Sequence, residues 1–117
     1  IIGVSTHSTG QALQAAGDVA DYIACGPVFR TPTKPDYLPV GLELVKEYKR
    51  LVRIPFVAIG GVEEANVDQV IAAGADRVAV VRAVGAAADP ASAARSLKAK
   101  IIVSLARRAE TALGGIA

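Results

Sequence analysis

Hydroxyl groups and a positive charge gather in one unusually long loop, GPVFRTPTKPDYLPVG, which runs from Gly26 to Gly41. Connections between a strand and a helix usually take about 2–6 residues, so this one has room for a second task. Thr31, Thr33 and Lys34 offer two hydroxyls and an ammonium group that suit a phosphate ligand. An exposed turn with a solvated lysine is the alternative. The prolines around these donors reduce the entropy lost on ordering, and they favour an anion-binding loop.

Three other stretches carry groups that could bind a ligand. Ser5 offers a hydroxyl to a phosphate, or it caps the next helix, and the spacing leaves both readings open. His7, the only histidine, could move a proton, although a histidine beside a helix start more often has a structural role. Paired glycines in AIGGV, residues 58–62, would let the backbone approach a ligand, or they form a tight turn. Val81 and Arg82 precede an alanine-rich segment that suits the short extra helix of a barrel phosphate site.

Strands and helices are expected to alternate along the chain. Apolar runs predict strands at residues 1–5, 21–25, 55–59 and 77–81, and helical periodicity predicts helices at residues 8–16, 42–52, 63–73 and 90–112. Such alternation implies parallel strands and an α/β fold, in which ligands bind at the carboxyl ends of the strands. The candidate groups above lie at the end of a predicted strand or in the loop after it, so they are expected to share one edge of the sheet.

The length of the chain limits its architecture. One strand-helix unit takes about 30 residues and an eight-unit barrel about 250, whereas the chain has 117. We therefore predict an α/β fold of the (β/α)8 TIM-barrel type, with residues 1–113 forming its last four units, strands five to eight, and residues 114–117 a disordered tail. The start at Ile1, without Met, suggests a missing upstream part. Another chain, a second copy or an upstream segment would then cover the open edges and the apolar face. A small doubly wound sheet is the structural alternative.

The composition argues against several classes of protein. The chain is 52% hydrophobic with a net charge of +2, so neither disorder nor a nucleic-acid partner is expected. No membrane-length apolar run and no signal peptide is visible, so we expect a cytoplasmic protein without a membrane partner. Cys25 lies in an apolar run and is expected to be buried and unreactive. The sequence shows no metal-ligand cluster, and the cations of the last helix are expected on its solvated face. These are Lys98, Lys100, Arg107 and Arg108.

Four motifs, in order, resemble the C-terminal half of thiamine-phosphate synthases. They are GVSTHS, ADYIACGPVFRTPTKPDYLPVGLE, IPFVAIGGVEEANV and AAGADRVAVVRAV, and the resemblance covers about residues 1–99. It implies a (β/α)8 barrel and a transferase that joins 4-amino-5-hydroxymethyl-2-methylpyrimidine diphosphate to a thiazole phosphate. The products would be thiamine phosphate and pyrophosphate. The resemblance also implies magnesium, whose aspartate ligands would lie in the missing N-terminal half.

The resemblance assigns roles to residues of this chain. Ser5 and Lys34 match the family's catalytic positions and would contact the pyrimidine diphosphate. The family's substrate-binding positions match Thr31, Pro32, Thr33, Gly61, Val81 and Arg82. The first three would touch the thiazole, and the last three would hold its phosphate. Arg82 stands where the family often has Ser, so its guanidinium would either strengthen phosphate binding or point away.

Three other functions compete with this reading. The isolated chain is expected to be inactive because the metal-binding half is absent, which leaves a non-catalytic phosphate-binding fragment as one alternative. The sister family of thiazole tautomerases is another, in which His7 would move protons, although that family typically lacks the Thr-Pro-Thr-Lys run. A different phosphate-handling barrel enzyme is the third.

Overall fold

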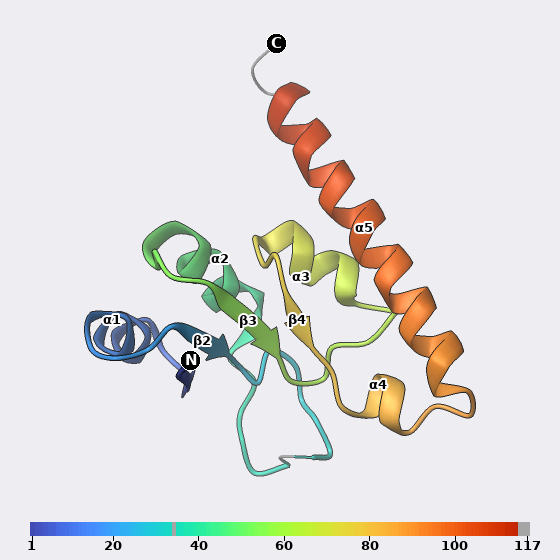
Figure 1. Ribbon diagram of the computed structural model, residues 1–117, viewed down its shortest axis with the longest axis horizontal. Helices are drawn as coiled ribbons and strands as arrows, with labels where there is room; N and C mark the ends of the chain where they lie inside the picture. Colours follow the sequence, from blue (N-terminus) through green and yellow to red (C-terminus); the bar gives the residue numbers. More distant parts are fainter. Residues whose placement is uncertain (34, 115–117) are drawn as a thin grey trace.

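The structure is a computed structural model that describes residues 1–33 and 35–114. Strands and helices alternate along the chain, as the sequence predicts (Figure 1). In chain order the elements are β1 (Gly3–Thr6), α1 (Thr9–Gly17), β2 (Tyr22–Cys25), α2 (Gly41–Leu51), β3 (Phe56–Ile59), α3 (Val67–Ala73), β4 (Val78–Ala79), α4 (Arg82–Gly85) and α5 (Pro90–Gly114). None of the helices within these ranges is long and apolar enough to cross a membrane.

The strands of the described residues form one parallel sheet in the order β1-β2-β3-β4. Each strand therefore pairs with its neighbours in the sequence. A doubly wound sheet reverses its strand order at a switch point, and the observed order has no such reversal. The predicted parallel α/β fold is confirmed, and the doubly wound alternative is not supported.

The two faces of the sheet differ in burial. Ile23, Cys25 and Phe56 lie on one face, where they are buried in the core that the sheet shares with the helices. Tyr22 and Val57 alternate with them on the other face and stay exposed or partly exposed. Burial raises the pKa of Cys25 to about 12, so its thiol stays protonated at neutral pH. The expectation of a buried, unreactive cysteine agrees with this environment.

A buried hydroxyl pair connects the second helix to the first strand. Tyr48 of α2 is fully buried, and its hydroxyl lies 2.7 Å from Thr6 Oγ1 and 3.0 Å from the carbonyl oxygen of Ser8. Thr6 Oγ1 also lies 2.7 Å from the Ala24 carbonyl oxygen. The hydroxyls of Thr6 and Tyr48 thus make three polar contacts between them, one with each other and one each with a backbone carbonyl. Burial, the main cause, raises the pKa of Tyr48, which keeps its hydroxyl protonated and able to donate.

Some element boundaries differ from those predicted. α3 begins at Val67 rather than at residue 63, because the side chain of Asn66 accepts a hydrogen bond from Glu63 N and holds these residues in a turn. β4 has two residues rather than five, and as the last strand of the order it pairs with β3 alone. α5 includes Gly114, one residue into the predicted tail. Residues 115–117 lie outside the described residues.

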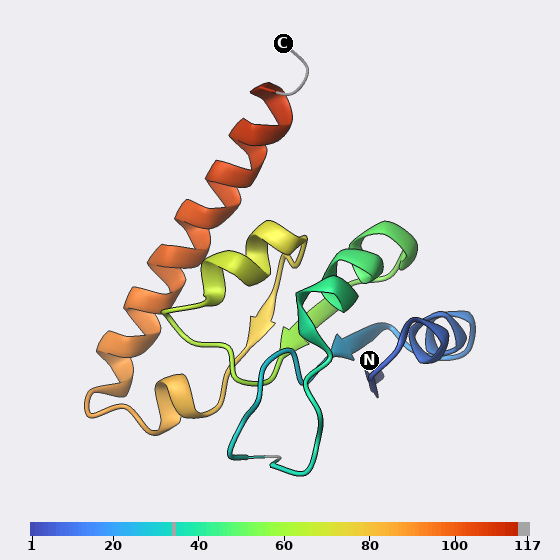
Figure 2. The ribbon, with the colours of Figure 1, turned by 180° about the vertical axis from the view of Figure 1, so that it is seen from behind.

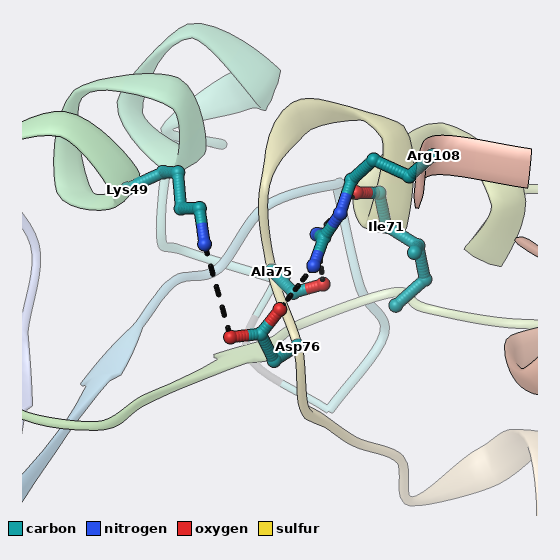
Figure 3. A network of polar contacts seen from close by, with 5 residues as sticks. All are labelled: Lys49, Ile71, Ala75, Asp76 and Arg108. Carbon is teal, nitrogen blue, oxygen red and sulfur yellow. Dashed lines mark hydrogen bonds and ion pairs between the residues drawn. The ribbon is translucent and has the colours of Figure 1, made fainter. Parts of the chain in front are cut away.

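Arg108 joins α5 to the end of α3 (Figure 3). Its guanidinium donates to the carbonyl oxygens of Ile71 at 2.9 Å and Ala75 at 3.1 Å, and it pairs with the carboxylate of Asp76. Lys49 Nζ of α2 lies 3.9 Å from the other Asp76 oxygen. The hydrogen bond from Arg108 is the largest influence on the pKa of Asp76 and lowers it. The predicted solvated face is therefore wrong for Arg108, because helical spacing alone cannot show that the end of α3 lies opposite.

α5 also lies alongside α3 and extends well beyond the rest of the chain (Figures 1 and 2). Besides the contacts of Arg108, Lys100 Nζ donates to the carbonyl oxygen of Glu64. This contact is exposed, so it does not contradict the expected solvated position of Lys100. Lys100 thus bonds to the turn before α3, and Arg108 bonds to backbone carbonyls at its C-terminal end.

We expect the ion pair of Asp76 to make stability depend on pH. Its lowered pKa means that the contribution is complete above the ordinary value of 3.8 and is lost as the pH falls through the lower folded-state value. Asp76→Asn should cost no more than about 1 kcal/mol at neutral pH, because the pair is partly exposed. Urea unfolding at several pH values should show a smaller loss of stability below pH about 4 for the variant than for the wild type. Glu110→Gln, which changes an exposed acid of α5, is the control. Equal dependence of stability on acid pH in all three proteins would contradict the assignment.

Candidate functional site

A cavity of about 670 Å³ lies at the carboxyl ends of the strands. The loops after β1, β2, β3 and β4 all contribute to its wall. The predicted site residues that line it are Ser5, Thr31, Pro32, Thr33, Gly61, Val81 and Arg82. Lys34, the remaining predicted site residue, lies outside the described residues. The structure thus brings every described candidate to one cavity, and the roles of these residues stay predictions.

The loop after β2 is fastened at its base by backbone hydrogen bonds. Val28 N donates to the carbonyl oxygen of Ile59 at 2.9 Å, and Phe29 N donates to that of Gly60 at 3.0 Å, so the chain continues to pair with the end of β3. On its return, Val40 N donates to the carbonyl oxygen of Pro27 at 2.7 Å. The residues between these points form the arm that projects below the sheet in Figure 1. The length of the loop therefore places threonine side chains at the cavity.

Within the arm, Thr31 is the buried member. Its hydroxyl oxygen lies 3.3 Å from Thr33 N and accepts a hydrogen bond from it, whereas Thr33 is exposed. This local bond fixes the direction of the chain just before position 34. Both threonines line the cavity, Thr31 as a buried residue and Thr33 as an exposed one.

The Gly60–Gly61 turn needs residues without a side chain. Gly61 has a φ of +66°, and a Cβ there would lie 2.8 Å from both the carbonyl oxygen of Arg30 and Cβ of Phe29. Gly60 has a φ of +105°, and its Cβ would lie 2.4 Å from Cα of Pro27. The turn is therefore packed backbone to backbone against the loop after β2, which agrees with the tight-turn interpretation of the paired glycines.

The same turn offers backbone donors to the cavity. The N–H groups of Gly61 and Val62 have no hydrogen-bond partner within the described part of the chain. Both residues line the cavity. Successive unpaired N–H groups of this kind form a site for a phosphate oxygen.

Asn66 also lines the cavity and was not predicted as a site residue. Its Nδ2 donates to the carbonyl oxygen of Gly61 at 3.0 Å, and its Oδ1 accepts from Glu63 N at 2.9 Å. Asparagine just before an apolar helical run is a sequence signal for a helix start. That signal could have located Asn66 at a turn, although it could not have shown the contact with Gly61.

The residues after β1 divide into structural and available groups. Ser8 caps α1, since its Oγ accepts from Gln11 N at 3.2 Å, so the capping alternative does not apply to Ser5. Ser5 is exposed, and its hydroxyl makes no hydrogen bond within the described residues. His7 Nδ1 lies 2.6 Å from the carbonyl oxygen of Gly26. A carbonyl can only accept, so Nδ1 carries the hydrogen and a neutral ring has its lone pair at Nε2.

The charged side chains that line the cavity favour an anion over a cation. Among the described residues they are Arg30, Arg82 and Glu63, which leaves one net positive charge. No group of three or more His, Cys, Asp or Glu residues within the described ranges is placed to hold a metal ion. A single carboxylate beside two guanidinium groups is a poor magnesium site. The residues present therefore do not fit a magnesium centre of their own.

Comparison with known proteins shows that this chain is similar to members of one family. Residues 1–84 match the family described as thiamine monophosphate synthase. A thiamine-phosphate synthase of Chloroflexus aurantiacus is 50% identical over 105 residues, which cover 89% of this chain and 49% of that protein. Its counterpart in Methanocella arvoryzae is 54% identical over 102 residues, covering 86% and 48%. The solved structure of a thiamine phosphate pyrophosphorylase from Pyrococcus furiosus matches with a TM-score of 0.83 and 38% identity, over 90% of this chain and 50% of that one. The chain thus spans about half the length of these relatives.

We expect Gly61→Ala to destabilise the fold through the turn. The added Cβ would meet two groups at 2.8 Å in a left-handed backbone conformation, which should lower the free energy of unfolding by about 1–3 kcal/mol. Gly10→Ala is the matched control, because a Cβ at this helical position meets nothing within 4 Å and should stabilise the chain by up to about 1 kcal/mol. Chemical denaturation of both variants provides the measurement. A Gly61→Ala protein as stable as the wild type would show that the turn is not packed as described.

Proposed function

The chain belongs to the thiamine monophosphate synthase family, and from this membership we propose that it forms the thiazole-phosphate-binding half of a thiamine-phosphate synthase. The reaction joins 4-amino-5-hydroxymethyl-2-methylpyrimidine diphosphate to a thiazole phosphate. The bond between the pyrimidine methylene carbon and the diphosphate oxygen breaks, and the thiazole nitrogen then forms the new C–N bond to that carbon. The observation that supports this most is the single cavity that gathers the described candidate residues from four loops.

Stabilising the departing negative charge is the main catalytic task in such a reaction, and it is electrostatic. The free hydroxyl of Ser5 donates to the diphosphate in this proposal. Lys34 holds the same group on the basis of its sequence position alone. Donors already in place before the bond breaks do not need to reorganise as charge develops.

The opposite side of the cavity would take the thiazole phosphate. The unpaired N–H of Gly61 and the backbone at Val81 and Arg82 hold the phosphate, and the Arg82 guanidinium adds a positive charge. Thr31, Pro32 and Thr33 form the wall against the thiazole ring. An arrangement with one phosphate group on each side would bring the thiazole nitrogen toward the pyrimidine carbon.

We also propose that residues 1–113 form the last four units, strands five to eight, of a (β/α)8 barrel. Strands in sequential parallel order fit a segment of barrel wall. Leu13 of α1 and Ile102 of α5 are exposed, and so is Tyr22 on the uncovered sheet face. The proposed partner is the other barrel half, or a second copy in its place. The magnesium ligands are proposed to lie on that other half.

We expect the 117-residue chain to bind thiazole phosphate without producing thiamine phosphate at a robust rate. Calorimetry should detect binding of the thiazole phosphate and much weaker binding of the unphosphorylated thiazole alcohol. Arg82→Ala should weaken binding of the phosphorylated form about fivefold, the loss of one partly exposed ion pair. Product formation is measured with both substrates and magnesium.

Arg77→Ala is the control for this experiment, because Arg77 precedes β4 at the opposite end of the strand and does not line the cavity. If the alcohol and the phosphate bind equally tightly, the proposed phosphate-binding site is contradicted. Robust turnover by the chain alone would contradict the need for a second half.

One observation favours the tautomerase alternative enough to test it. His7 lines the cavity with its Nδ1–H engaged by Gly26, which leaves Nε2 as a base. If the transferase proposal is right, the chain should not isomerise a thiazole phosphate in the absence of the pyrimidine substrate. Isomerisation that His7→Gln abolishes would instead support the tautomerase, and NMR of the thiazole protons distinguishes the two results.

A further inference from the structure

Each carbonyl around the glycine turn has a donor from elsewhere in the protein. Ile59 O accepts from Val28 N at 2.9 Å, and Gly60 O accepts from Phe29 N at 3.0 Å. The third carbonyl, of Gly61, accepts from the side chain of Asn66 at 3.0 Å. Backbone geometry supplies the first two bonds, whereas the third depends on one side chain.

The carbonyl partners decide where the N–H groups point. In a trans peptide unit the C=O and the N–H of the next residue lie in one plane and point in opposite directions. Fixing Gly60 O therefore fixes the direction of the Gly61 N–H, and fixing Gly61 O fixes that of the Val62 N–H. Neither N–H has a partner within the described residues, and both residues line the cavity.

We infer that Asn66 is a positioning residue for the phosphate of the substrate. Its Nδ2 holds the Gly61–Val62 peptide so that the Val62 N–H faces the cavity, and its Oδ1 occupies Glu63 N, the next donor along the chain. Glycine at position 61 permits rotation of this peptide, because it has no Cβ to prevent it. Rotation would turn the Gly61 carbonyl toward the cavity and present a negative dipole to the phosphate.

This inference rests on the proposed function, since it concerns the same phosphate. The chemistry it requires is an anion with several acceptor oxygens, such as a phosphate monoester. Both polar atoms of the Asn66 side chain bond to the turn, so its removal should change affinity through the orientation of a peptide. A side chain that served only to start α3 would change stability and leave the affinity unaltered.

The experiment is an NMR titration of the 117-residue chain with inorganic phosphate, following the backbone amide signals of Gly61 and Val62. In the wild type both signals should shift. Asn66→Ala should weaken phosphate binding about tenfold, the effect of misplacing one hydrogen-bond donor, and should reduce the shift of Val62 more than that of Gly61. Gln69→Ala is the matched control, because it removes an exposed side-chain amide from α3, the helix that Asn66 precedes.

A second variant separates folding from positioning. In Asn66→Ser, α3 should still form, because the Asn66 side chain makes no capping hydrogen bond to this helix and serine suits a helix start. The shorter serine side chain lacks the amide donor for Gly61. This variant should bind phosphate as weakly as Asn66→Ala, while its thermal midpoint stays close to that of Gln69→Ala. Phosphate binding by a folded Asn66→Ser at wild-type strength would overturn the inference and leave the proposed function intact. Unshifted Gly61 and Val62 signals in the wild type, with inorganic phosphate and with thiazole phosphate, would overturn the proposed site itself.

Discussion

The close approach of two backbones at the carboxyl end of the sheet is the constraint on which the cavity depends. A Cβ at Gly26 would lie 2.3 Å from the carbonyl oxygen of Ile59, and one at Gly60 would lie 2.4 Å from Cα of Pro27. With no side chains at these points, the pairing of β2 with β3 continues past the strand ends into both loops. The long loop thereby starts from a fixed base, and its threonines reach the same cavity as the glycine turn. Larger residues at these positions would separate the two walls.

The opposite end of the sheet has a different task. There Arg108 binds carbonyls at the end of α3 and the carboxylate of Asp76, just before β4 begins. This cluster faces away from the cavity and contributes none of its lining residues. Substitutions at the amino ends of the strands are therefore expected to change stability alone. Substitutions at the carboxyl ends are expected to change ligand binding, and at the closely packed glycines they should also lower stability. Barrel enzymes show the same separation of their two ends.

Much of the fold and the membership of the cavity could be predicted from the sequence, because both follow from simple periodic rules. Strand-helix alternation places loops at one edge, so Ser5, Thr31 and Arg82 were expected near one another and do line one cavity. Contacts between side chains and distant backbone atoms could not be predicted in this way. Asn66 binds the carbonyl of Gly61, five residues before it, and Arg108 binds carbonyls more than 30 residues before it. Helical spacing describes one element at a time and carries no information about such partners.

The net charge of the cavity indicates that this chain supplies only part of the proposed site. Arg30 and Arg82 against Glu63 leave one net positive charge among the described lining residues. Two phosphorylated reactants bring several negative charges, and burying these without compensation is costly. In the proposed enzyme, Lys34 and the second half of the barrel therefore provide the remaining positive charge. The neutral donors of this chain are the Ser5 hydroxyl and the N–H groups at Gly61 and Val62. In the proposed enzyme they would orient the phosphate groups without adding to that charge.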